Sequence, residues 1–172
     1  MSQQTQNLMK KISLAKLVLN IGVGKSGEPI EIGKKTLAQI TGKKPNARNA
    51  KKSQRDWGVR KGEPIGIAVT VRGNDATKLL KKLLVVKDNQ IAEKAFDNEG
   101  NLSFGIKEHI DIPEIKYDPK IGILGLEVSI SLARPGFNIK FNKSKAKVGK
   151  NHRIAKNDAM KFLTEEFGVK VV

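Results

Sequence analysis

The stretch TGKKPNARNAKKSQRDWGVRKGEPIGIAVTVRG, residues 41–73, consists of a cationic segment followed directly by an apolar one. Between Gly42 and Gly62 the segment contains eight basic residues and one acidic residue, Asp56, together with the only tryptophan of the chain, Trp57. The basic residues are Lys43, Lys44, Arg48, Lys51, Lys52, Arg55, Arg60 and Lys61. The apolar part, residues 65–71, is rich in β-branched side chains and predicts a strand. A cationic, aromatic-containing loop that leads into a strand favours a surface for a folded polyanion; a solvated, flexible loop is the alternative.

A second cationic cluster lies between residues 134 and 156, where the sequence has no Asp or Glu. Its basic residues are Arg134, Lys140, Lys143, Lys145, Lys147, Lys150, Arg153 and Lys156. The two clusters account for 15 of the 16 net positive charges, so the rest of the chain is almost neutral. Such separate patches favour binding to phosphate backbones, because Lys and Arg side chains displace the counterions that are condensed on the nucleic acid. An anionic membrane would also attract them, but no amphipathic anchor accompanies the patches.

Length and composition limit the class of protein. The 172 residues suit a single domain, with a polar segment at 1–11 and a basic extension at 134–156. The absence of cysteine excludes disulfides and thiolate metal sites. No apolar run approaches the roughly 18 residues that span a bilayer, and the N-terminus lacks a signal-peptide core. We therefore expect a soluble, cytoplasmic protein without a membrane partner.

Apolar periodicity predicts an α+β fold. We expect strands at 16–22, 46–51, 65–72, 101–107 and 124–132, and a short edge strand at 169–172. Helices are expected at 28–40, at 74–86 with Asn74 as its cap, at 89–95, and at 157–167 with Asn157 as its cap. An extended connection is expected at 109–117. This order predicts a mainly antiparallel sheet with helices packed on one face, a two-layer sandwich whose other face is open to a partner.

A glycine loop between the first strand and helix resembles a dinucleotide-binding fingerprint. Gly22, Gly24 and Gly27 have its spacing. However, no acidic residue lies between Glu31 and Asp56 to hold the ribose, and the later strands do not alternate with helices as a doubly wound sheet requires. A nucleotide-dependent oxidoreductase is therefore the alternative from another functional class.

The same loop also resembles the end of a phosphate-binding P-loop. Gly24, Lys25 and Ser26 fit, but the first glycine of that motif would fall at Leu19. Backbone N–H groups at a helix N-terminus, with Lys25 beside them, can still bind an RNA phosphate. A tight strand-to-helix turn is the structural alternative.

No catalytic constellation is evident in the sequence. His109 and His152 are far apart, and neither lies within a cluster of metal ligands. The carboxylates at 97–114 include no convincing acid–base pair. We expect no enzymatic activity, no cofactor and no metal.

Several blocks together resemble the family of large-subunit ribosomal protein five. They are, in order, LVLNIGVG (17–24), ITGKKP (40–45), AKKS (50–53), RKGEPIG (60–66), VTVRG (69–73), FDNEGNLSFGIKEH (96–109) and IPEI (112–115). The match covers nearly the whole chain. The short N-terminus and the ending with RPG (134–136), KNHR (150–153) and FGV (167–169) resemble the archaeal and eukaryotic branch.

This resemblance implies a structural constituent of the large ribosomal subunit that binds 5S rRNA and helps anchor it in the central protuberance. Asn20 and Thr70 match the family's interface asparagine and threonine. The loop at 51–63 matches the one that reaches P-site tRNA, and the family forms a bridge to a small-subunit head protein. Large-subunit rRNA and other central-protuberance proteins are further implied partners. Lys43 and Trp57 stand where bacterial members carry Gln and Phe. A nonspecific single-strand binder remains a second alternative.

The candidate site residues form three groups. For 5S rRNA they are Asn20, Gly22, Gly24, Lys25, Lys43, Lys44, Arg48, Thr70 and Arg72. For the tRNA-contact loop they are Lys51, Lys52, Ser53, Arg55, Trp57, Arg60 and Lys61. In the basic extension, the candidate rRNA contacts are Arg134, Lys140, Lys143, Lys145, Lys147, Lys150 and Arg153.

Overall fold

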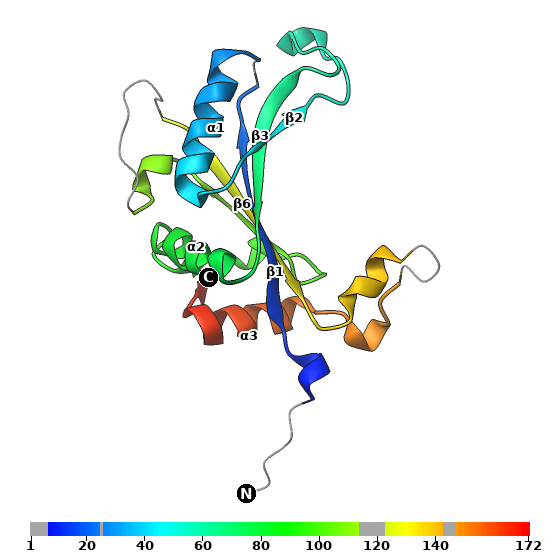
Figure 1. Cartoon of the computed structure of the whole chain (residues 1–172). Helices are drawn as coiled ribbons and strands as arrows, with labels where there is room; N and C mark the ends of the chain where they lie inside the picture. Colours follow the sequence, from blue (N-terminus) through cyan, green and yellow to red (C-terminus); the bar gives the residue numbers. More distant parts are fainter. Residues whose placement is uncertain (1–6, 25, 114–122, 143–146) are drawn as a thin grey trace, which may run out of the picture.

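A five-stranded sheet forms the centre of the computed structural model, which describes residues 7–24, 26–113, 123–142 and 147–172 (Figure 1). The strands are β1 (Ser13–Gly22), β2 (Asn46–Asn49), β3 (Pro64–Val71), β5 (Leu102–Ile106) and β6 (Leu126–Ala133). Their order is β2-β3-β1-β6-β5, and all four pairings are antiparallel. The predicted antiparallel sheet is therefore confirmed, and the parallel doubly wound alternative is wrong.

Alternation along the strands gives the sheet one apolar face. Leu17 of β1 lies opposite Val71 of β3 and Ile130 of β6, and all three side chains are buried. Leu19 and Ile21 continue the same face. Because side chains alternate between faces, the residues between them point the other way. Full burial of each Leu or Ile stabilises the fold by about 1.5–3 kcal/mol, which fixes the register of the sheet.

Three helices cover the apolar face (Figure 1): α1 (Glu28–Thr41), α2 (Asn74–Val85) and α3 (Lys156–Phe167). Their buried side chains, among them Leu37, Leu80 and Leu163, join one core with those of the strands. Helix α1 approaches β3 closely at Gly33, where an added Cβ would lie 2.5 Å from Cδ1 of Ile67. The predicted helices at these positions are confirmed, within a residue or two at each end.

The helix caps differ from the prediction. Residues Gly73 and Ala155 occupy the N-cap positions of α2 and α3, without a side-chain capping hydrogen bond. Asn74 is therefore the first residue inside α2, and Asn157 is the second residue inside α3. At the other end of α1, Gly42 adopts the left-handed conformation (φ 63°) and its N–H bonds to the Ala38 carbonyl, as a C-terminal glycine should.

The predicted helix at 89–95 is wrong. Asp88 and Asn89 both have left-handed backbone angles, with φ of 53° and 54°, which ends the helical path. The chain then forms β4 (Gln90–Ile91), which pairs in parallel with β7 (Lys170–Val171), and the 3₁₀ turn η3 (Glu93–Ala95). The expected edge strand at the C-terminus is thereby confirmed, but its partner is this segment and not the main sheet.

The other short elements are 3₁₀ turns. They are η1 (Leu8–Lys10), η2 (Arg55–Trp57), η4 (His109–Asp111), η5 (Phe137–Phe141) and η6 (Lys150–His152). The turn η4 corrects the extended connection expected from residue 109, and residues 114–122 lie outside the described part. In the part of the chain that the structure describes, no helix is long and apolar enough to cross a membrane.

Candidate nucleic-acid interface

The sheet face opposite the helices carries small and polar side chains. Asn20 of β1 lies in register with Ala68 of β3 and Glu127 of β6, and its Nδ2 donates a hydrogen bond to Oε2 of Glu127 over 3.3 Å. In the neighbouring row, the exposed Thr70 lies beside Val18. A polar sheet face can hydrogen-bond to the ribose and phosphate groups of a folded RNA.

One edge of this face is lined by β2, and the glycines of the face lie beside it. Arg48, which is exposed, pairs in register with Gly66, and Gly66 pairs in turn with Gly22. An added Cβ at Gly66 would lie 3.1 Å from the Ile21 carbonyl, so glycine lets the strands approach here. The predicted residues Asn20, Gly22, Arg48 and Thr70 are thus brought onto one surface.

Other predicted 5S contacts lie apart from this face. Lys43 follows the C-terminus of α1, and its Nζ forms a 3.0 Å ion pair with Asp75 in the first turn of α2. Lys44 and Arg72 are exposed, and Lys25 lies outside the described residues. The ion pair neutralises one cation that the sequence alone assigned to RNA.

The glycine loop is a tight turn between β1 and α1. The N–H groups of Val23 and Gly24 both donate to the carbonyl of Ile65, over 3.0 and 2.9 Å. These two donors are therefore occupied within the protein. The first turn of α1 also carries Glu28 and Glu31, whose charges favour the helix dipole but repel a phosphate. The local geometry supports the structural interpretation of this motif.

The loop between β2 and β3 is a folded hairpin. Gln54 and Val59 form an antiparallel bridge around η2, and the Ala50 N–H donates to the Glu63 carbonyl over 2.8 Å. Ser53 Oγ accepts from the Lys61 N–H over 2.9 Å, so the predicted tRNA-contact serine holds the loop together. A defined hairpin replaces the flexible loop that composition allowed.

This hairpin presents its cations and its tryptophan to solvent. Trp57 is 78% exposed, and its indole ring is not part of the hydrophobic core. The predicted basic residues around it are also exposed, namely Lys51, Lys52, Arg55, Arg60 and Lys61. An exposed indole costs hydrophobic stabilisation unless a partner covers it. The hairpin therefore has the features of a contact surface.

The basic extension is only partly free to meet a ligand. Arg134 is 12% exposed, and it donates to Asp158 over 2.9 Å and to the Arg153 carbonyl over 3.2 Å. Lys140 forms an ion pair with Glu99 over 3.4 Å. The exposed cations in the described part of this region are Lys140, Lys147, Lys150 and Arg153, while Lys143 and Lys145 lie outside the described residues.

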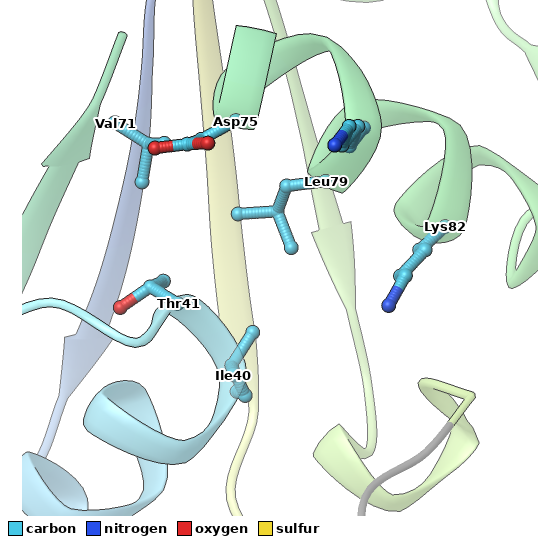
Figure 2. A pocket seen from close by; sticks show the side chains of 7 residues that line it. Ile40, Thr41, Val71, Asp75, Leu79 and Lys82 are labelled. Atoms are coloured by element: carbon cyan, nitrogen blue, oxygen red, sulfur yellow. The ribbon is translucent and has the colours of Figure 1, made fainter.

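A small cavity of about 190 Å³ lies on the helical side of the sheet (Figure 2). Ile40 and Leu79 point into it from α1 and α2, and Asp75 lies at its rim. Its other lining residues are Thr41, Val71, Lys78 and Lys82. The cavity is far from the open face, which carries the predicted RNA residues on the opposite side of the sheet. Its lining does not contain an acid–base pair or a nucleophile with a base.

Three titratable side chains, those of His109, Glu93 and Lys156, form contacts within the fold. The buried His109 accepts a 3.3 Å hydrogen bond at Nδ1 from the Leu124 N–H. Lys156 donates a 2.7 Å hydrogen bond to Glu93 and lowers the pKa of that carboxyl. Within the described ranges, no group of three or more His, Cys, Asp or Glu is arranged to hold a metal ion.

Sequence comparison places the chain among known proteins. The family described as ribosomal protein L5 matches residues 7–60, and the model for the C-terminus of the same ribosomal family matches residues 64–162. The chain belongs to the ribosomal protein L5 family. Strands from both matched regions share one sheet, because β1 and β2 come from the first region and β3, β5 and β6 from the second.

The curated relatives in the L5 family include archaeal proteins named large ribosomal subunit protein uL5. The chain is 63% identical to that of Nitrosopumilus maritimus, over 99% of both chains. It is 56% identical to that of Cenarchaeum symbiosum, over 95% of this chain and 98% of the relative. For Sulfurisphaera tokodaii the identity is 46%, over 98% and 97%. These matches confirm the resemblance and its archaeal branch, and they identify a structural protein and not an enzyme.

Sequence reasoning missed some members of the open face. Glu127 and Ser129 of β6 face outward beside Asn20 and Val18. The alternation of residues 126–132 gave the signal, because every second residue there is apolar and the others must point away from the core. The exposed Phe141 was also missed, since an isolated phenylalanine in a basic stretch has no periodicity to indicate its direction.

Proposed function

We propose that this chain is a structural constituent of the large ribosomal subunit that binds 5S rRNA with the open face of its sheet. It helps anchor that RNA in the central protuberance, in contact with large-subunit rRNA and neighbouring proteins in the cytoplasm. The hairpin at 51–63 contacts P-site tRNA, and the protein forms a bridge to a protein of the small-subunit head. The family membership and the archaeal relatives named as large-subunit proteins support this assignment.

The observation that carries the proposal is the polar row on the open face. Asn20 donates a hydrogen bond to Glu127, which favours one orientation of its amide, and Thr70 is exposed one row away. Arg48 and the glycines beside it extend the same surface to the β2 edge. Fixed polar groups set the register on folded RNA, while cations contribute sequence-independent affinity. Lys44 and Arg72, which are exposed but lie apart from this face, supply such cations elsewhere on the surface.

The tRNA contact is supported by the position and build of the hairpin. The hairpin extends beyond the Gly22–Gly66 end of the sheet, where β2 ends at Asn49 and β3 begins at Pro64. Trp57 projects at its tip among cations, and hydrogen bonds such as Lys61 N–H to Ser53 hold the shape. A preorganised hairpin loses less conformational entropy on binding than a flexible loop does.

A carboxylate placed on the open face tests the proposal. The Thr70→Glu variant should lose at least tenfold in affinity for 5S rRNA, because a charge that repels phosphate replaces a neutral hydroxyl. Thr164→Glu, on an exposed position of α3, is the matched control and should bind normally. Circular dichroism should show that both variants remain folded. Equal 5S affinity for Thr70→Glu and the control would overturn the assignment of this face.

A further inference from the structure

The described parts of the basic extension, residues 134–142 and 147–156, form a folded module that contains η5 and η6. His152 Nε2 lies 2.8 Å from the Pro135 carbonyl, and its ring meets Phe137 edge-on at 5.6 Å between centroids. Ile154 is buried, where it packs against Gly100. These contacts, with the Arg134–Asp158 ion pair, fix η5 and η6 against the body of the protein.

This module exposes an apolar surface beside its cations. Phe141 is 83% exposed and Ile139 is 50% exposed, both in η5. Met9 of η1 lies next to Gly136, which precedes η5. A Cβ added at Gly136 would lie 3.6 Å from Cε of Met9. The adjoining sequence 134–156 has no carboxylate. Three carboxylates from elsewhere, Glu93, Glu99 and Asp158, form ion pairs with Lys156, Lys140 and Arg134 of this sequence.

The module lies at the opposite end of the sheet from the tRNA-contact hairpin. β6 ends at Ala133, which pairs with Ser13, whereas the hairpin adjoins the Gly22–Gly66 end. Figure 1 shows the two projections, the hairpin at one end of the long strands and η5 at the other. A ligand on Phe141 is therefore separate from one on Trp57.

We infer that this module is a second RNA-binding site, in which Phe141 stacks on an unpaired nucleotide of large-subunit rRNA. Lys147, Lys150 and Arg153 are exposed and hold the flanking phosphates. Unpaired bases stack on exposed aromatic side chains, and cations beside the ring follow the backbone. The inference rests on the proposed function, because it assumes that the protein sits in the large subunit.

Charge selects RNA over a protein as the partner. Stable protein interfaces have cores depleted of charge, whereas Phe141 stands in a segment whose charged residues are all cationic. We assign the stacked nucleotide to large-subunit rRNA and not to 5S rRNA. The open face, which is assigned to 5S rRNA, runs along the strands, whereas the module lies beyond the end of β6 at Ala133.

Photo-crosslinking in assembled subunits tests the inference. p-Benzoylphenylalanine is introduced in the full chain at position 141, at position 104 on the core side of β5, or at position 70 on the open face. After irradiation of purified large subunits, position 141 should crosslink to large-subunit rRNA, and position 104 should give no RNA product. A product with protein or with 5S rRNA, or no product at 141, would overturn the inference.

Position 70 separates this inference from the proposed function. If position 70 crosslinks to 5S rRNA but position 141 does not crosslink to large-subunit rRNA, only the second site is wrong. If position 141 crosslinks to large-subunit rRNA but position 70 does not crosslink to 5S rRNA, the 5S assignment is wrong and the second site is still supported. As an independent check, Phe141→Ala should weaken binding of the 5S–protein complex to large-subunit rRNA by about 5- to 140-fold, and Phe141→Trp should restore it. Equal binding of the alanine variant and the parent would contradict stacking.

Discussion

His109 and Leu124 are joined by two hydrogen bonds across a segment of the chain. The His109 N–H donates to the Leu124 carbonyl over 3.0 Å, and the Leu124 N–H donates to Nδ1 of the His109 ring over 3.3 Å. Because Nδ1 accepts this bond, its lone pair is directed at the Leu124 N–H. The pair anchors the start of β6, the strand that carries Glu127 to the open face.

Loss of the His109 ring should destabilise the fold. His109→Ala leaves the Leu124 N–H without its acceptor and opens a cavity, so we expect a loss of about 2–4 kcal/mol in the free energy of unfolding. His109→Asn keeps an acceptor near the position of Nδ1 and should cost less. Urea denaturation monitored by circular dichroism measures both. If the two variants were equally stable, the hydrogen bond to Leu124 would contribute nothing.

Gly100 should tolerate no side chain. Its φ is +75°, and an added Cβ would lie 2.6 Å from Cγ2 of the buried Ile154. Gly100→Ala should therefore lower the free energy of unfolding by about 1–3 kcal/mol, through backbone strain and overpacking. Gly149→Ala is the matched control, because its φ is −56° and nothing lies within 4 Å of the added Cβ. Equal melting temperatures for the two variants would show that the 97–100 turn yields easily.

The Glu93–Lys156 ion pair should give a weak pH dependence of stability. The hydrogen bond from Lys156 lowers the pKa of Glu93 in the folded state below its ordinary value of 4.5. A lowered carboxyl pKa stabilises the fold at pH values above 4.5, and this contribution is lost as pH falls through the folded pKa. Glu93→Gln should thus have a slightly lower melting temperature than the parent at pH 7, and the same difference should vanish near pH 2. Because Glu93 is exposed, a large difference at pH 7 would be unexpected.

Trp57→Ala should separate the two proposed RNA contacts. The indole is exposed and bears no core contact, so the melting temperature should stay within about 1 °C of the parent and 5S affinity should be unchanged. Contact with P-site tRNA should weaken, as seen in tRNA footprints on assembled ribosomes. Asn20→Ala should do the reverse. A large loss of 5S affinity in Trp57→Ala would show that the hairpin also serves the 5S interface.

Local patterns were enough to predict most of the fold. The alternation around Leu17 and Leu19 and the helical spacing of Leu80 and Leu83 each bury one face, and that burial dominates the energetics of each element. The sequence could not indicate the turn at Asp88, because two consecutive left-handed residues without glycine are rare. The parallel β4–β7 pair was also missed, since a two-residue strand has no period to detect.

The sequence indicates which residues lie on the polar face of the sheet, but it does not indicate the ion pairs and hydrogen bonds that the candidate residues form. The family resemblance singled out Asn20 and Thr70, and the register of β1 and β3 places both on the polar face of the sheet. The ion pairs Lys43–Asp75 and Arg134–Asp158 join residues more than 20 positions apart, and only the tertiary fold shows that these cations are neutralised. The hydrogen bonds of Val23 and Gly24 to Ile65 likewise depend on the β1–β3 register, so the motif alone could not show that its donors are occupied.

Competition binding over a salt series tests the central claim most directly. The full chain is titrated with labelled 5S rRNA against unlabelled tRNA and an unrelated folded RNA, from about 50 to 300 mM salt. If the polar row at Asn20 and Thr70 sets the register, 5S rRNA should win by at least a hundredfold at the upper end, where nonspecific phosphate contacts are weakest. If all three RNAs bind alike and affinity collapses together with salt, the surface is only electrostatic and the proposed 5S interface is wrong.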